Sequence, residues 1–316
     1  MFVTSTNKGH KDIYPKSDCV EMIDAHVHLY PKDCSWRFYT WIEKKHRQKT
    51  TMPIEWDLAL KKLDEMGVEN LFNLTHAIVP DLTERLNEWQ IQLKRRYGFI
   101  VFGAFHPKND PRLLEEAFEG GIDGLKLHPA VQGFRPDSPE ALKIYDLLEE
   151  LKKPLCIHTG WFPDNGFLFS SPEQFEPLIY DYTFPVILAH LFHGKIESVR
   201  KFFDARKNVY GDASNVMVDF TFRDKTGKIM EWRSRDAIPI IEEYSDRVMY
   251  GSEIPLIWWR AEQVYDNLIK YFDDRLCKKL LNENAAHFVR RHLSNSGKSR
   301  FRKDSAGQNL QEELHE

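Results

Sequence analysis

Histidines in this chain stand where short apolar segments end, and imidazole nitrogen is a common ligand for divalent metal ions. The first such place is the run Asp24-Ala25-His26-Val27-His28. Side chains of a β-strand alternate between its two faces, so His26 and His28 would point the same way and could reach one ion. A pair at this spacing, taken alone, is more often structural than metal-binding, so the other residues that would lie near it decide between the two roles.

Three more residues that bind metals or move protons occupy the same position in later segments. His158 lies near the end of one apolar run, His190 ends the next, and Glu253 follows the last. If the runs are strands of one barrel, these side chains meet at one rim, where buried imidazoles and a carboxylate need a partner. A divalent cation would supply it. Nitrogen with carboxylate oxygen suits Zn²⁺ first, with Mn²⁺, Fe²⁺ or Co²⁺ as alternatives.

The elements that would position these residues follow from hydrophobic patterning, because strand-length apolar runs alternate with amphipathic helical stretches. The expected strands lie in Met22–Tyr30, Val68–His76, Gly98–Phe105, Gly121–Leu127, Pro154–Gly160, Phe184–His190, Asn208–Ser214 and Arg247–Glu253. The expected helices lie in Trp56–Met66, Asp81–Arg96, Pro111–Glu119, Pro139–Leu151 and Ile196–Ala205. This alternation predicts an α/β fold, a (β/α)₈ TIM barrel, with an open doubly wound sheet as the alternative that the pattern does not exclude.

The chain divides into three parts. We expect an N-terminal arm at residues 1–20, the barrel at 21–293 and a disordered polar tail at 294–316. Within the barrel, residues 31–54 make an unusually long first βα loop with several aromatic residues, which is typical of a lid or a pocket wall.

Composition excludes several classes of protein. The 316 residues contain 44 Lys+Arg against 48 Asp+Glu, so no strong net charge draws the chain to nucleic acid or a membrane surface. The four cysteines form no CxxC pair, no apolar signal segment precedes the first strand, and no run is long enough to span a bilayer. We therefore expect a cytoplasmic protein with a small-molecule substrate, and a homodimer would be the commonest assembly.

Seven motifs in order, over roughly residues 22–290, resemble the amidohydrolase superfamily and specifically its amidohydrolase-2 branch of TIM-barrel enzymes. They are Ile23-Asp24-Ala25-His26-Val27-His28, Gly124-Leu125-Lys126-Leu127-His128-Pro129, Ile157-His158-Thr159-Gly160, Leu188-Ala189-His190, Tyr210-Gly211-Asp212-Ala213-Ser214, Tyr250-Gly251-Ser252-Glu253-Ile254-Pro255 and Asn282-Glu283-Asn284-Ala285. The resemblance implies a metal held by His26, His28 and His158. It also implies that His190 ligates or holds the reacting water and substrate, and that Glu253 binds metal and moves a proton. The branch usually has aspartate at position 253.

Four other residues are candidates for substrate binding. Lys126 could bind a substrate carboxylate, form a buried ion pair or, as in binuclear relatives, bridge two metals as a carbamate. His128 shares its strand face and could contact substrate or be structural. Arg135 could clamp an acidic substrate or be a solvated loop residue, and Trp161 could line the pocket or pack within its loop.

The expected function is that of a metal-dependent hydrolase acting on an amide, lactone or ester of a small carboxylate-bearing molecule. Glu253 would take a proton from metal-activated water and return it to the leaving group, while His190 would steady the oxyanion. One alternative is a non-oxidative decarboxylase of the same branch, which the cations Lys126 and Arg135 would favour. Another is a non-catalytic barrel that lost its chemistry at position 253.

Overall fold

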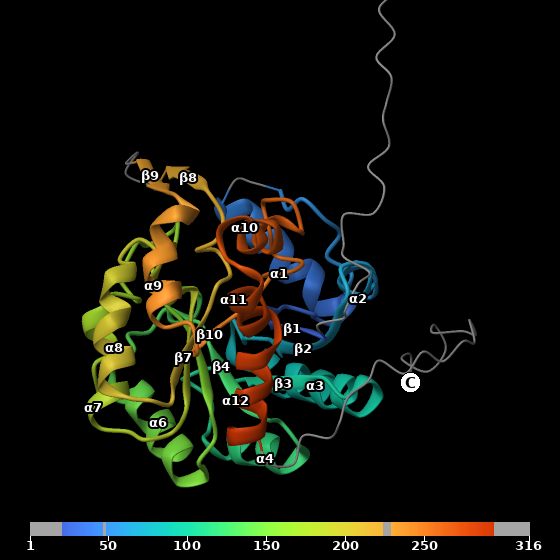
Figure 1. Cartoon of the computed structure of the whole chain (residues 1–316). Coiled ribbons are helices and arrows are strands. Elements are labelled where there is room, and N and C mark those ends of the chain that lie inside the picture. The colour runs from blue at the N-terminus through green and yellow to red at the C-terminus, as the bar shows by residue number, and fades with distance from the viewer. Residues whose placement is uncertain (1–20, 47–48, 224–228, 294–316) are drawn as a thin grey trace, which may run out of the picture.

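The centre of the computed structural model, which describes residues 21–46, 49–223 and 229–293, is a ring of eight parallel strands (Figure 1). Neighbouring strands pair in the order β1-β2-β3-β4-β5-β6-β7-β10. Their bounds are β1 Met22–Val27, β2 Val68–Leu74, β3 Ile100–Ala104, β4 Gly124–Leu127, β5 Leu155–His158, β6 Val186–Ala189, β7 Val209–Asp212 and β10 Val248–Met249. The predicted barrel is confirmed.

Backbone hydrogen bonds join the first and last strands and bring the barrel nearly to closure. The Ala25 N–H donates to the Tyr250 carbonyl, and the Glu253 N–H donates to the His26 carbonyl, both at 2.8 Å. The register of β1 against β2 shifts between Asp24 and Val27. Closure matters for the site because it places residue 253 directly beside the histidine pair.

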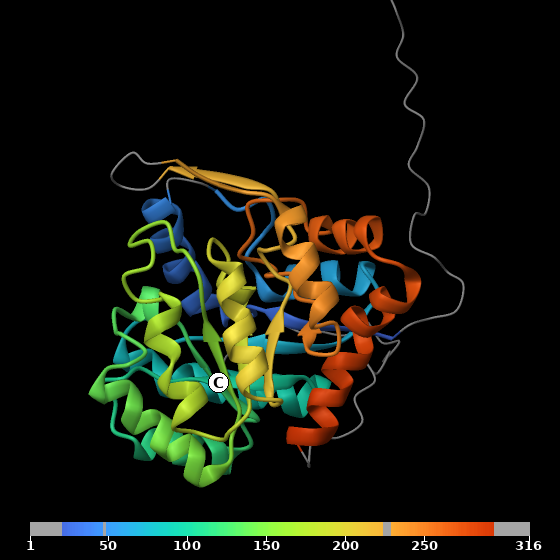
Figure 2. The ribbon, with the colours of Figure 1, turned by 60° about the vertical axis from the view of Figure 1, so that its left-hand side comes forward.

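Helices surround the strands (Figures 1 and 2). Their bounds are α1 Lys32–His46, α2 Trp56–Glu65, α3 Thr83–Tyr97, α4 Arg112–Gly120, α5 Pro129–Gln132, α6 Pro139–Leu151, α7 Pro177–Tyr180, α8 Val199–Ala205, α9 Ile238–Glu243, α10 Gln263–Tyr271, α11 Asp274–Lys278 and α12 Asn284–His292. The predicted helix at Pro139–Leu151 is found with these bounds, because Ser138 caps its N-terminus and proline occupies the first turn.

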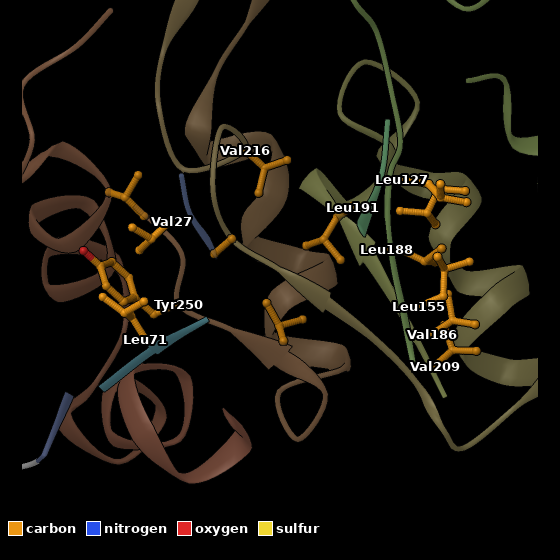
Figure 3. Close-up of a cluster of buried hydrophobic side chains, with 14 of the residues drawn as sticks. Val27, Leu71, Leu127, Leu155, Val186, Leu188, Leu191, Val209, Val216 and Tyr250 are labelled. Carbon is orange, nitrogen blue, oxygen red and sulfur yellow. The ribbon is translucent and has the colours of Figure 1, made fainter. Parts of the chain in front are cut away.

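Two apolar layers hold the barrel together. The larger one lies between strands and helices and includes Val27, Leu127 and Leu155, which Figure 3 shows among the buried side chains. The smaller one fills the barrel interior, where Phe288 of α12 packs against Phe72 and Tyr210. Because the interior is filled by this layer, the functional cavity opens where the carboxyl ends of the strands meet.

The structure adds two features to the expected outline. Residues 31–54, expected as a loop, contain α1, and an antiparallel pair of strands, β8 Phe220–Arg223 and β9 Ile229–Trp232, stands outside the barrel (Figure 2). The predicted arm at 1–20 and tail at 294–316 lie outside the described residues. Within the described ranges, none of the helices has both the length and the apolar character that crossing a bilayer requires.

Candidate active site

A cavity of about 700 Å³, counting its open mouth, lies at the carboxyl ends of the strands. Its polar lining comes from strand ends: His26, His28, Lys126, His158, His190 and Glu253 all contribute to it. Its apolar lining comes from loops, α1, α5 and β8, and includes Phe38, Trp161, Phe162, Trp258 and Trp259. The barrel therefore brings together residues that are far apart in the sequence and surrounds them with aromatic rings.

His26 and His28 face each other in this cavity. Their Nε2 atoms are 3.1 Å apart, and both side chains are buried. His26 Nδ1 is 2.9 Å from a carboxylate oxygen of Asp212, and His28 Nδ1 is 2.6 Å from the Leu74 carbonyl oxygen. A carbonyl oxygen can only accept, so the proton of His28 sits on Nδ1, and the Asp212 carboxylate favours the same arrangement in His26. Both Nε2 atoms are then left with lone pairs.

Glu253 reaches the same point. Its Oε1 is 3.1 Å from His28 Nε2, and its Oε2 is 3.3 Å from His26 Nε2. The backbone of Glu253 has a φ of 69°, in the left-handed region that residues other than glycine rarely adopt. Its backbone N–H donates to the His26 carbonyl. The longer glutamate side chain, which replaces the usual aspartate, therefore still delivers its carboxylate to both histidines.

His190 is oriented by a hydrogen-bonded relay. Its Nδ1 is 2.8 Å from the Ser214 hydroxyl, and that hydroxyl donates a hydrogen bond to Asp212. Because the serine proton is directed to Asp212, the serine oxygen accepts from His190 Nδ1–H, and Nε2 of His190 keeps a lone pair. With its lone pair, Nε2 of His190 can bind a metal ion or accept a hydrogen bond from the reacting water. It has no proton to donate to an oxyanion, so that expected role fits this arrangement less well.

His158 lies close to this group without joining it. Its ring centroid is 4.9 Å from that of His190 and 3.9 Å from that of His128, on which it stacks. Both of its ring nitrogens are buried, and neither has a hydrogen-bond partner among the described residues. Unpaired buried nitrogens are costly, so this ring is suited to a ligand that the chain itself does not supply.

Lys126 is buried at 1% exposure beneath the histidines. Its ammonium nitrogen is 3.4 Å from His26 Nε2 and donates to the Cys156 sulfur at 3.6 Å. In the described part of the chain, no carboxylate oxygen lies within ion-pair distance of this nitrogen. The lysine thus places a positive charge at the floor of the cavity without a paired acid.

Burial sets the protonation of the site. It is the largest cause of the lowered pKa values of His26, His158 and His190, and the nearby Lys126 charge lowers them further. Neutral imidazole is the form that binds a metal ion. Burial raises the pKa of Asp212 to about 7, against the lowering effect of the Ser214 hydrogen bond.

The remaining predicted residues divide between the cavity and the surface. His128 and Trp161 both line the cavity. Arg135 does not line it: its side chain is 53% exposed and pairs with Asp137 at 2.7 Å. An arginine two residues from an aspartate satisfies its charge locally, so the structure does not bring Arg135 to the site.

Sequence reasoning missed His76 and Tyr30. His76 is buried, lines the cavity and follows β2, while Tyr30 contacts it through its hydroxyl at 3.1 Å. The strand-end rule that identified His158 would also have found His76, which closes the predicted strand segment Val68–His76. Tyr30 likewise closes the predicted strand segment Met22–Tyr30, but its contact with His76 joins the ends of two different strands, and no sequence signal marked that contact.

The arrangement fits a divalent cation. Metal–nitrogen bonds of about 2.0–2.1 Å at a tetrahedral angle place two ligand nitrogens roughly 3.3 Å apart. The facing Nε2 atoms of His26 and His28 are 3.1 Å apart, and the Glu253 carboxylate completes a three-residue group. A second group, His26, His190 and Asp212, is also close enough, but its nearest atoms already hydrogen-bond to one another or to Ser214. The first group is therefore the better cation site.

Solved structures share this fold at low identity. An uncharacterised TIM-barrel protein from Bordetella bronchiseptica is 14% identical, with a TM-score of 0.67 over 85% of this chain and 98% of its own. A 2,6-dihydroxybenzoate decarboxylase from Rhizobium is 14% identical, with a TM-score of 0.60 over 85% and 98%. A probable 2-pyrone-4,6-dicarboxylic acid hydrolase from Acinetobacter baumannii, with citric acid bound, is 15% identical, with a TM-score of 0.56 over the same shares.

The family is shown by the sequence itself. A comparison with curated proteins finds no match. The sequence model of the amidohydrolase-2 family, described as Amidohydrolase, matches residues 23–291, which span the barrel from β1 into α12. The family is one of enzymes and is typically metal-dependent, and its structural neighbours include the decarboxylase and the probable hydrolase named above. The chain therefore belongs to the amidohydrolase family, in its amidohydrolase-2 branch.

Proposed function

We propose that the chain is a metal-dependent hydrolase that cleaves an amide, lactone or ester bond in a small carboxylate-bearing molecule. The observation that carries this proposal is the convergence of His26 Nε2, His28 Nε2 and the Glu253 carboxylate within 3.3 Å of one another. These atoms lie at the floor of a cavity with aromatic walls, so a small organic substrate would be held directly above them.

His26, His28 and Glu253 would hold the ion, and His158 would complete the set through one of its unpaired nitrogens. These donors suit Zn²⁺ first, with Mn²⁺, Fe²⁺ or Co²⁺ as alternatives. The bound ion would supply an acidified water and polarise the carbonyl of the substrate.

The proton transfers fall to residues of the chain. The Glu253 carboxylate is mostly buried, and its Oε2 has no hydrogen-bond partner among the described residues, so it is placed to take a proton and deliver it to the leaving atom. His190 Nε2, with its lone pair, would accept a hydrogen bond from the attacking water and orient it. The Lys126 ammonium would stabilise developing negative charge or bind the substrate carboxylate.

Decarboxylation of an aromatic acid is the second candidate. The buried Lys126 ammonium, which no described carboxylate pairs with, could hold a carboxylate over the metal group, and the aromatic walls would pack against a planar ring. In that reaction the bond to the carboxylate carbon breaks, CO₂ leaves, and Glu253 or a water delivers a proton to the ring carbon.

The experiment loads the purified chain with one metal at a time and assays two panels. Small lactones, esters and amides are followed by acid release, and aromatic acids by CO₂ release. Metal-dependent acid release supports the hydrolase, and CO₂ without acid release supports the decarboxylase. Metal binding without turnover on either panel, with activity gained in Glu253→Asp, would identify the non-catalytic barrel.

Replacing Glu253 by glutamine tests the proton transfer. The amide keeps the shape of the side chain but cannot accept the proton, so kcat should fall about 10²- to 10⁴-fold. Steady-state kinetics measure the change, and Asp137→Asn, an acid outside the cavity, serves as the matched control. A Glu253→Gln enzyme with unchanged kcat would exclude Glu253 as the proton carrier.

Replacing His158 by alanine tests the ligand set. The variant should lose both bound metal and activity, because a ligand to the ion is gone. Elemental analysis after dialysis gives the metal content, and His106→Ala is the control, since His106 follows β3 but does not line the cavity. Full metal occupancy in His158→Ala would refute the assignment.

A further inference from the structure

His76 presents an unused hydrogen-bond donor to the cavity. It follows β2, is 2% exposed, and its Nε2 is buried with no partner among the described residues. The Tyr30 hydroxyl lies 3.1 Å from its Nδ1 and also accepts from its backbone N–H at 3.2 Å. Since the hydroxyl oxygen accepts there, its own proton is free to go to Nδ1, which leaves the ring proton of His76 on Nε2.

His128 presents a second donor beside it. Its Nδ1 accepts from the Val131 backbone N–H at 3.3 Å, so its ring proton also sits on Nε2. The ring centroids of His76 and His128 are 5.0 Å apart, and both rings line the cavity.

The surroundings of the two donors define what they would bind. The Phe38 ring meets His76 edge to face at 5.1 Å, and the Phe162 ring meets His128 in the same way at 5.2 Å. The His76 ring also lies 5.9 Å from that of His28, so the pair stands next to the cation site without belonging to it. A buried donor without an acceptor is costly, and two neighbouring N–H groups between aromatic rings match a planar group with two acceptor oxygens.

We infer that His76 and His128 form an oxyanion subsite that binds a carboxylate of the substrate beside the metal group, with Tyr30 as the residue that positions His76. The inference deepens the proposed function and rests on it for the identity of the ligand as a substrate. The subsite sets specificity: it selects molecules with a carboxylate on a planar, apolar body and rejects neutral analogues, whose weaker acceptors gain less from the two donors.

The test measures binding without metal and without turnover. Isothermal titration calorimetry on the chelator-treated full chain gives the dissociation constants of benzoate and of its neutral analogue benzamide. The wild type should bind benzoate more tightly. His76→Phe keeps an aromatic ring and removes the donor, so it should weaken benzoate binding about 10- to 100-fold while changing benzamide binding much less.

Two further variants separate hydrogen bonding from packing. His76→Gln can place an amide N–H near the position of Nε2 and should restore most of the benzoate affinity. Tyr30→Phe removes the hydroxyl that fixes the ring of His76 and should weaken benzoate binding in the same direction. The control is His106→Phe, the same exchange at a buried histidine outside the cavity, which should leave both constants unchanged. Thermal denaturation checks that each variant is folded.

The outcomes are distinct from those that test hydrolysis. The subsite is overturned by a wild type without preference for benzoate, by equal losses for the two ligands in His76→Phe, or by His76→Gln binding as weakly as His76→Phe. If His76→Phe does not fold, Tyr30→Phe and His76→Gln decide by the same comparison. A chain that never hydrolyses a substrate can still show the predicted binding, whereas an active hydrolase with none of these effects would reject the subsite alone.

Discussion

Asp212 determines which nitrogen of His26 is free. One of its oxygens is 2.9 Å from His26 Nδ1, while the other accepts from the hydroxyl and the backbone N–H of Ser214. A carboxylate behind a metal-binding histidine fixes the tautomer and the ring orientation, and this arrangement raises the basicity of the ligand. The sequence placed Asp212 in one of the seven motifs but did not pair it with His26, which lies 186 positions away.

At the residue scale we predict that Asp212→Asn weakens metal binding about 10- to 100-fold. The amide oxygen would stay with the Ser214 donors, so the amide nitrogen would face His26 Nδ1 and move the ring proton to Nε2. Competition with a chromophoric chelator measures the zinc affinity. Asp123→Asn is the control, a buried aspartate that binds Lys94 on a different part of the barrel. Equal affinities in wild type and Asp212→Asn would contradict the role of Asp212.

The junction of β1 and β10 is the element on which the site depends. A Cβ built on Gly251 would stand 2.7 Å from His26 Cβ and 3.3 Å from Ser214 Cβ, so only glycine allows this approach. The chain continues from Gly251 to the left-handed residue Glu253 within two positions. A small change in this turn therefore displaces a histidine and a carboxylate together.

At the element scale we predict that Gly251→Ala lowers the free energy of unfolding by about 1–3 kcal/mol, the usual cost of overpacking. It should also weaken metal binding, because the new methyl group pushes His26 away from His28. Urea denaturation and zinc titration measure the two effects. In the control Gly120→Ala, at the end of α4, the added methyl meets only the flexible tip of Ile91 and zinc binding should not change. A stable Gly251→Ala with wild-type zinc affinity would show that the junction tolerates the methyl group.

Buried neutral histidines shape the stability of the whole molecule. Burial lowers the pKa of His193 to about 4 and holds those of His76, His128, His158 and His190 well below the usual value. In the unfolded chain these rings titrate near 6.5. Burial also raises the pKa values of Asp24 and Asp212 to about 7, which opposes the histidines, but the acids are fewer than the rings.

At the scale of the molecule we predict that the metal-free protein loses stability as the pH falls below about 6.5. Above that pH both states carry neutral rings. Below it the rings become protonated in the unfolded chain but stay neutral in the folded one. Each such ring lowers the free energy of unfolding by up to about 1.4 kcal/mol per pH unit. Urea midpoints measured from pH 7.5 to 5 check the slope, and His193→Asn should reduce it. A midpoint that stays constant or rises on acidification would contradict the prediction.

How much the sequence could predict depends on how local each feature is. The apolar runs and helix signals identified the strands of the barrel and α6, because strand and helix periodicity and capping act over a few residues. The sequence did not predict the β8–β9 pair, because β9 is largely exposed and lacks an apolar run. His76 was not identified as a site residue because no motif contains it, although it lies at the end of a predicted strand, where functional residues of a barrel gather.

By itself the sequence determined the family, the strands and the strand ends where histidines could meet, since these follow from local patterns and from their order along the chain. The pattern favoured a barrel but left an open sheet possible, and the structure decided between them. Only the tertiary structure decided which side chains converge. It joined Glu253 to the His26–His28 pair, aligned Asp212 behind His26, left Arg135 at the surface and set His76 beside His128. The physical reason is that hydrogen bonding, burial and ring contacts act through space, between segments that nothing in the chain order brings together.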